Sequence, residues 1–255
     1  MKQEFAPITD IKRLTNEILE LSFRSKYLSE VTKPGQFINI HVDEHFPLLR
    51  RPFSVFNIVE DKVSIAFNVV GLGSTVLSRK KIGETLDILG PCGNDFLQFI
   101  DGNYDTAIIA AGGIGVAPFQ LLTNTLRNKK KIVTFLGGRN KELIVKHGLE
   151  NVNISTDDGS EGFQGTVLEL IKNDFSKNDY GKIRFFTCGP TRMMKALADY
   201  AKEIGAECYA SLETGMACGI GLCQGCNIEM VGSEKKYKLV CKEGTIFETQ
   251  TIKFQ

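Results

Sequence analysis

The sequence contains few histidines, almost no net charge and no long apolar runs. Its 255 residues include only three histidines, His41, His45 and His147, which leaves little material for a histidine-based metal site or catalytic triad. The 31 basic and 30 acidic residues give a net charge of +1, so no long-range field favours nucleic acid or an anionic membrane. No apolar run approaches the ~18 residues of a membrane span, and the N-terminus lacks an apolar signal core. These absences predict a cytoplasmic protein that neither binds nucleic acid nor spans a membrane.

Cysteine is used unevenly along the chain. The seven cysteines are an odd number, and four of them follow residue 217, which leaves Cys92, Cys188 and Cys208 scattered and unpaired. This usage is typical of a reducing compartment, where thiols serve metals or chemistry rather than disulfides. No role for Cys92 or Cys208 follows from the sequence.

The pattern of apolar residues changes after residue 102. Before it, apolar and polar residues alternate with period two in short runs, which is typical of half-buried strands in a sandwich or small barrel. These runs are 18–24, 38–42, 63–69 and 85–88. After it, continuous apolar strands alternate with helical stretches, which predicts βαβ units and a parallel sheet. We expect a β-barrel in residues 1–100, an α/β domain in 101–210 and a small cysteine-bearing domain in 211–255.

The cysteines after residue 217 follow the spacing C-x4-C-x2-C, with a fourth cysteine after fourteen intervening residues. This is the ligand pattern of a plant-type [2Fe-2S] cluster. Glycines between the cysteines let the backbone approach a compact inorganic core. Structural zinc remains the alternative, although it normally uses two C-x2-C pairs and only Cys223 and Cys226 form one here. The candidate ligands are Cys218, Cys223, Cys226 and Cys241.

Two segments of the predicted barrel are candidates for binding a flavin nucleotide. In the first, which follows a predicted strand, an arginine can hold a pyrophosphate through its planar guanidinium while a serine lies near the flavin ring. The second is a glycine-rich turn that opens a short helix and presents amide groups and hydroxyls to a phosphate. An ordinary Arg-Pro turn and an ordinary strand-to-helix turn are the alternatives. The candidate residues are Arg51, Pro52, Phe53, Ser54, Asn68, Val69, Val70, Gly73, Ser74 and Thr75.

Two segments of the predicted α/β domain are candidates for binding a nicotinamide nucleotide. A glycine-rich loop between a buried strand and a helix resembles the dinucleotide fingerprint, although proline replaces its third glycine. A Cys-Gly-Pro turn follows another strand at the sheet edge where ligands bind, and a flat nicotinamide ring could lie against it. A buried cysteine at a strand end is the alternative for Cys188. The candidate residues are Gly112, Gly113, Gly115, Pro118, Cys188, Gly189 and Pro190.

These segments, in this order, resemble the ferredoxin–NADP reductase superfamily, in which a flavin-binding barrel precedes a pyridine-nucleotide domain. The resemblance covers nearly the whole chain and rests on Arg51-Pro52-Phe53-Ser54 and Cys188-Gly189-Pro190. Together with the cysteine segment, the stretches 49–54, 89–94, 216–221 and 240–244 are similar to the electron-transfer subunits of type B dihydroorotate dehydrogenase. Asn68, Ser74, Cys92, Gln224 and Asn227 depart from the usual residues of that family.

The resemblance implies FAD, one [2Fe-2S] cluster held by the four cysteines, and NAD(H) as the soluble electron carrier. It further implies an FMN-containing dihydroorotate dehydrogenase catalytic subunit as partner, assembled into a heterotetramer for pyrimidine biosynthesis. Electrons would pass from dihydroorotate through the partner's FMN, the cluster and FAD to NAD+. Ser54 would orient the flavin edge and Cys188 would border the nicotinamide. Glu213 could approach the flavin or be a surface carboxylate.

Two other functions remain open from the sequence. The same cofactors could serve a diaphorase subunit of a hydrogenase, sulfide reductase or transhydrogenase complex. A non-catalytic binding module stabilised by zinc belongs to a different class and would be colourless. The preference for NAD or NADP does not follow from the sequence.

Overall fold

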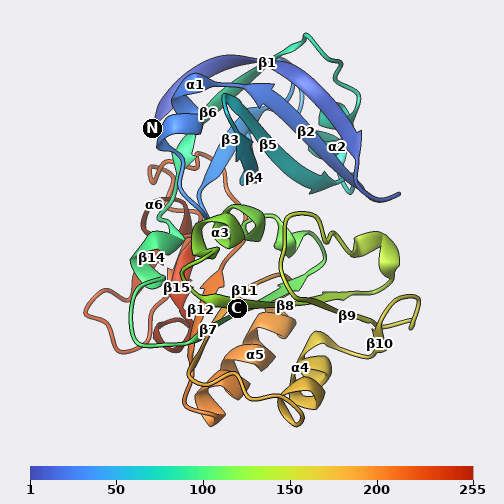
Figure 1. The fold of residues 1–255 in the computed structure, drawn as a ribbon. Coiled ribbons are helices and arrows are strands. Elements are labelled where there is room, and N and C mark those ends of the chain that lie inside the picture. The colour runs from blue at the N-terminus through green and yellow to red at the C-terminus, as the bar shows by residue number, and fades with distance from the viewer. Residues whose placement is uncertain (255) are drawn as a thin grey trace.

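The computed structural model describes residues 1–254, which begin with a closed antiparallel barrel (Figure 1). Its strands follow the order β1-β2-β5-β4-β3-β6. They are β1 (Lys2–Arg13), β2 (Ile18–Arg24), β3 (Phe37–His41), β4 (Arg51–Val59), β5 (Lys62–Asn68) and β6 (Thr85–Cys92). The short helices α1 (Lys26–Val31) and α2 (Leu72–Ser78) lie in the connections. The barrel predicted from the alternating pattern is confirmed.

The barrel core consists of the apolar residues that alternate along the predicted strands. Leu21 and Phe23 of β2, Ile38 and Ile40 of β3 and Ile65 of β5 are all fully buried in one cluster. Burying a side chain of this size contributes roughly 1.5–3 kcal/mol relative to leaving it in water. Alternation along these strands therefore decides which face points inward.

The Arg-Pro segment follows β3, as expected, but it starts strand β4 instead of forming a turn at the proline. Residues 51–54 begin β4, and Pro52 is paired with Asn39 of β3. Proline is tolerated because β4 pairs with β5 only from Val55 onward, so this end of the strand has no neighbour on its second side.

A seven-stranded sheet follows, in the order β10-β9-β8-β7-β11-β12-β15. All its neighbouring strands are parallel except β12 and β15. The strands are β7 (Thr106–Gly112), β8 (Lys131–Gly138), β9 (Val152–Thr156), β10 (Phe163–Gln164), β11 (Ile183–Cys188), β12 (Glu207–Ser211) and β15 (Ile246–Glu248). Figure 1 shows α3 (Phe119–Leu126) between this sheet and the barrel, with α4 (Val167–Phe175) and α5 (Thr191–Glu203) on the opposite face. The predicted parallel-sheet domain is confirmed.

The cysteine segment leaves the sheet after β12 and returns to it at β15, where Ser211 is paired with Ile246. Between these strands lie β13 (Asn227–Glu229), β14 (Tyr237–Leu239) and α6 (Val240–Glu243). Its buried residues form one cluster with Phe37 and Cys92 of the barrel and Met194 of α5. The segment is therefore fixed at both ends and packs against both larger domains.

Four short 3-10 turns complete the described chain: η1 (Phe96–Phe99), η2 (Gly113–Val116), η3 (Lys141–Leu143) and η4 (Thr249–Thr251). Among the helices of residues 1–254, none is long and apolar enough to cross a membrane.

Candidate functional site

An open cavity of ≈ 490 Å³ lies where the barrel, the parallel sheet and the cysteine segment meet. The barrel supplies eight of the predicted flavin-site residues to its wall: Arg51, Pro52, Phe53, Ser54, Asn68, Val70, Gly73 and Ser74. The sheet domain contributes Ile114 and Ala117, and the cysteine segment contributes Glu213, Thr214 and Met216. All three parts of the chain therefore share one cavity.

The two adjacent arginines have different surroundings. Arg51 lines the cavity against Gly73, where an added Cβ would lie 3.0 Å from its Nε atom. Its guanidinium donates to the Leu49 carbonyl oxygen at 2.9 Å and has no acidic partner within residues 1–254. Arg50 instead donates to the Asp87 carboxylate at 2.7 Å, outside the cavity. Arg51 is therefore the arginine with a guanidinium available to a phosphate.

The glycine-rich turn uses the Ser74 hydroxyl internally. Its Oγ accepts from the amides of Val70 at 3.0 Å and Gly71 at 3.1 Å, and donates to the Gly71 carbonyl oxygen at 2.9 Å. The amides of the first turn of α2 have no carbonyl of the helix to bind. The turn therefore offers an anion its Leu72, Gly73 and Ser74 amides. Thr75 lies outside this cavity and Val69 lines a neighbouring one of ≈ 350 Å³.

The cavity wall also contains aromatic surface and an unsatisfied acceptor. The rings of Phe53 and Phe67 meet edge to face, with centroids 5.6 Å apart. The Oδ1 atom of Asn68 is buried and has no hydrogen-bond partner within residues 1–254. A buried acceptor without a donor destabilises the fold unless a bound molecule supplies the donor. An apolar wall, one free acceptor and a free guanidinium fit a flavin nucleotide.

The two nucleotide-binding candidates meet at the carboxyl edge of the parallel sheet. Cys188 ends β11 and is buried, and burial raises the pKa of its thiol, with a smaller contribution from the Glu213 carboxylate. An added Cβ on Gly115 would lie 2.6 Å from the Gly189 amide nitrogen. Gly115 is therefore required for close backbone packing between the two loops, whereas the space next to Gly113 is open. None of the predicted residues of either loop lines the cavity at the barrel, although Ile114 and Ala117 of the first loop do.

Replacing Gly115 with alanine should destabilise the protein by about 3 kcal/mol, because the backbone atoms at the end of β11 cannot rotate away from the new methyl group. Urea unfolding measures the change. Gly113→Ala is the control: its φ of +54° strains an alanine, but no atom lies within 4 Å of the added Cβ. We expect it to cost about 1–2 kcal/mol. Equal destabilisation by the two variants would contradict this packing role.

Glu213 is exposed and lines the cavity, as expected of a surface carboxylate, and its approach to a flavin stays a prediction. Desolvation by the surrounding protein raises the pKa of its carboxyl above 4.5. Only the protonated form is therefore favoured by folding. The protonated Glu213 carboxyl contributes fully to the stability of the fold below its unfolded-state pKa. This contribution is lost as the pH rises through its folded-state pKa.

The variant Glu213→Gln should accordingly unfold at a higher temperature than the natural protein at about pH 7, and the difference should vanish near about pH 4. Thermal unfolding across this range measures it, with Glu44→Gln on an exposed barrel loop as the control. A stability gain that persists unchanged at low pH would show that charge on Glu213 is not the cause.

The four cysteines of the C-terminal segment lie as two pairs. The Cys223 amide donates to the Cys218 sulfur at 3.3 Å, and the sulfurs of Cys226 and Cys241 are 3.1 Å apart. Cys226 and Cys241 are buried, Cys218 is half-buried and Cys223 is exposed. Across residues 1–254, no three His, Cys, Asp or Glu side chains are arranged to hold a single metal ion. Two pairs suit a binuclear cluster, in which two thiolates bind each iron, better than one tetrahedral zinc.

Backbone amides surround the sulfurs as the glycine-rich spacing predicts. Amides of Cys223 and Ile220 lower the pKa of the Cys218 thiol to about 6, so it is largely the metal-binding thiolate at neutral pH. The Cys241 amide donates to the Cys226 sulfur at 3.4 Å. The donor set therefore fits an iron–sulfur cluster chemically.

Several residues of the cavity wall carry little or no signal in the sequence. Phe37, Thr214, Met216 and Thr245 come from three separate segments and meet only in the folded chain. Met216 alone had a local indication, because it lies two residues before the first cysteine of the motif. Met216 therefore connects the cavity to the cysteine pairs.

Known proteins share the sequence and the architecture of this chain. A family model described as the iron-sulfur cluster binding domain of dihydroorotate dehydrogenase B matches residues 213–253, which include all four cysteines. The chain is 36% identical over 260 residues to the electron transfer subunit of dihydroorotate dehydrogenase B (NAD(+)) from Geobacillus sp. (strain WCH70), covering 99% of both.

Solved structures agree with the sequence comparison. An NADH-dependent reduced ferredoxin-NADP oxidoreductase superimposes with a TM-score of 0.85 at 27% identity, covering 98% of this chain and 90% of that one. A ferredoxin NADP+ reductase from Neisseria gonorrhoeae, solved with FAD and NADP, has the same fold, with a TM-score of 0.67 at 21% identity over 84% of this chain and 95% of that one.

The fold and the site thus define a flavin-dependent pyridine-nucleotide oxidoreductase with an added iron–sulfur segment. More narrowly, the chain belongs to the family of electron transfer subunits of dihydroorotate dehydrogenase B (NAD+).

Proposed function

We propose that this chain carries electrons between the catalytic subunit of a dihydroorotate dehydrogenase B and NAD+, using FAD and a [2Fe-2S] cluster. The observation that supports this most strongly is the single cavity to which the barrel, the sheet edge and the cysteine segment all contribute. When bound, FAD exchanges a hydride with NAD(H) and single electrons with an iron–sulfur cluster. The protein's own groups bind, orient and separate these partners.

On the barrel side, the guanidinium of Arg51 and the first-turn amides of α2 hold the flavin's phosphates. Phe53, Phe67 and Ser54 border the ring, and the Oδ1 atom of Asn68 accepts a hydrogen bond from the flavin. The Gly112–Pro118 and Cys188–Pro190 segments receive the nicotinamide nucleotide at the carboxyl edge of the sheet. Cys188 borders the nicotinamide, and the high pKa of its buried thiol keeps it neutral there.

On the other side of the cavity, Cys218, Cys223, Cys226 and Cys241 hold the cluster. Met216 lines the cavity two residues before Cys218, so the chain leads directly from the flavin site to the cluster ligands. We divide the chain at residues 100 and 210 into flavin, nucleotide and cluster domains, with β15 of the last one completing the sheet of the second. All seven cysteines are free thiols, which suits the reducing cytoplasm.

The partner expected is an FMN-containing dihydroorotate dehydrogenase catalytic subunit in a heterotetramer. Anaerobic purification with quantification of flavin, iron and acid-labile sulfide tests the cofactor assignment, and co-purification with the catalytic subunit tests the partner. A colourless protein with one zinc per chain would favour a structural binding module instead. A coloured protein that co-purifies with a different dehydrogenase would assign the same cofactors to another complex.

A further inference from the structure

Strand β3 connects the flavin cavity to the cysteine segment. Phe37, its first residue, lines the cavity. Asn39 lies two residues further along and therefore projects from the same face of the strand, about 7 Å away. Although this face lies outside the barrel core, Asn39 is only 2% exposed. Something other than the barrel therefore covers its side chain.

The covering segment is the cysteine loop at Gly219. An added Cβ on this glycine would overlap the Asn39 Nδ2 atom and would lie 2.9 Å from its Cγ. Gly219 has a φ of +67° and directly follows Cys218. The Asn39 carboxamide is therefore in van der Waals contact with the first turn of the cysteine loop.

The Asn39 amide protons have no strong acceptor. Within residues 1–254, the one hydrogen bond of this side chain runs from Nδ2 to the Cys92 sulfur, at 3.9 Å. A thiol sulfur is a weak acceptor, so a buried amide with two protons remains poorly satisfied. Such a group, directed at the loop that carries Cys218, indicates that its intended acceptor is bound by that loop.

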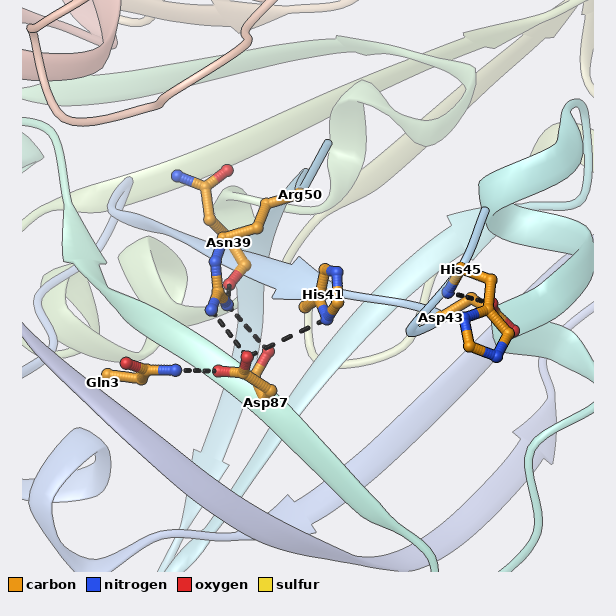
Figure 2. Close-up of polar contacts among 7 residues, drawn as sticks. All are labelled: Gln3, Asn39, His41, Asp43, His45, Arg50 and Asp87. Carbon is orange, nitrogen blue, oxygen red and sulfur yellow. Dashed lines mark hydrogen bonds and ion pairs between the residues drawn. The ribbon is translucent and has the colours of Figure 1, made fainter. Parts of the chain in front are cut away.

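A network beside Asn39, on the same outer face of β3, ties the Asn39 backbone to β6 (Figure 2). The Arg50 guanidinium donates to the backbone carbonyl oxygens of Asn39 at 3.4 Å and Asp87 at 3.0 Å. It also donates to the Asp87 carboxylate at 2.7 Å. Gln3 donates to the other Asp87 oxygen at 2.9 Å, and His41 Nδ1 lies 4.0 Å from the carboxylate. Strands β1, β3 and β6 are thereby tied together next to Asn39, whose carboxamide points away from the Arg50–Asp87 contact.

We propose that Asn39 is a positioning residue for the iron–sulfur site: its carboxamide seats the Gly219 turn on the barrel and turns its amide protons toward the sulfur-bearing loop. Through β3 it sets the spacing between the flavin cavity and the cysteines. The inference rests on the proposed function at one point, that the four cysteines bind a cluster. Hydrogen-bond donors near the sulfurs favour the more negative reduced form of a cluster and raise its reduction potential.

The variants Asn39→Ala and Asn39→Asp separate support from electrostatics. We expect the midpoint potential of the cluster to fall in the order natural protein, alanine, aspartate. The alanine step should change the reduction equilibrium about tenfold, as expected for one hydrogen bond to a charged group. Redox titration followed by electron paramagnetic resonance measures it, and Asn173→Ala, exposed on α4, is the control. Potentials unchanged in both variants would overturn the proposal, as would loss of flavin together with iron, which would make Asn39 a general structural residue.

A rescue experiment tests the contact itself. Gly219→Ala should load cluster poorly and lose iron to a chelator about tenfold faster, because the new methyl group overlaps the Asn39 amide. Gly232→Ala is a matched control with the same φ of +67° and no atom within 4 Å of its added Cβ. The double variant Gly219→Ala with Asn39→Ala should recover loading to the level of Asn39→Ala alone. Absence of recovery would overturn the contact assigned to Asn39.

Failure of this inference is distinguishable from failure of the proposed function. If the natural protein, purified anaerobically, holds neither iron nor sulfide, the cluster assignment itself is wrong. If it holds both while the Asn39 variants match it in potential and loading, only the role of Asn39 is wrong.

Discussion

Replacing Cys223 with serine should remove the iron–sulfur absorption of the protein and reduce bound iron from about two ions per chain to almost none. Cys223 is exposed, so its loss leaves no cavity in the core and the effect can be assigned to ligation. Bound flavin should be largely retained, because Cys223 does not line the flavin cavity. Visible absorption together with iron and sulfide determination measures both outcomes.

The control for this variant is Cys208→Ser, in the buried part of β12. Cys208 belongs to a core cluster separate from the four cysteines, so iron and sulfide should stay at the level of the natural protein. Absorption of Cys223→Ser that equals that of the natural protein would exclude Cys223 as a ligand.

The variant Arg51→Ala should weaken FAD binding about 100-fold. Its guanidinium faces the cavity without an acidic partner, and loss of charge-assisted hydrogen bonds to a phosphate accounts for an effect of this size. Titration of the flavin-free protein with FAD, followed by flavin fluorescence, measures the dissociation constant.

Two other arginines show whether the effect is specific. Arg24→Ala, on an exposed ion pair with Asp61, should leave FAD affinity unchanged. Arg50→Ala should mainly reduce thermal stability, because Arg50 ties β3 to β6 rather than facing the cavity. A larger loss of FAD affinity in Arg50→Ala than in Arg51→Ala would reverse the assignment of the two arginines.

The difference between these arginines illustrates the limit of the sequence prediction. The motif identified an arginine near a phosphate, but neighbouring residues point to opposite faces where a strand begins. Which of the two faces the cavity depends on the register of β4 against β3, where Arg51 is paired with Ile40. Local composition does not contain that information.

Elements with a clear period were predictable and those without one were not. β2 coincides with the alternating run at 18–24, because its apolar side chains alone suffice to define the buried face. β1 was not predicted, because it contains Pro7 and few of its side chains are buried. On α5, Met194, Leu197 and Ala198 are buried at helical spacing, while Ile204 lies 42% exposed just beyond the helix end.

The site was predictable where its residues are close in sequence. Cys218, Cys223 and Cys226 lie within one short loop, so their spacing alone brings them together. The approach of Cys241 to Cys226 depends instead on the fold, in which β13 and β14 pair and α6 begins just before Cys241. The contributions of Phe37, Asn39 and Thr245 depend on packing between segments that are far apart in the chain.

The central claim is that one chain holds a flavin and an iron–sulfur cluster close enough to share electrons. Anaerobic titration of the purified holoprotein with NADH, followed by visible absorption and low-temperature electron paramagnetic resonance, tests it most directly. The account predicts bleaching of the flavin together with the signal of a reduced [2Fe-2S] cluster. Bleaching of the flavin with no cluster signal at any NADH concentration, in protein that contains iron and sulfide, would contradict it.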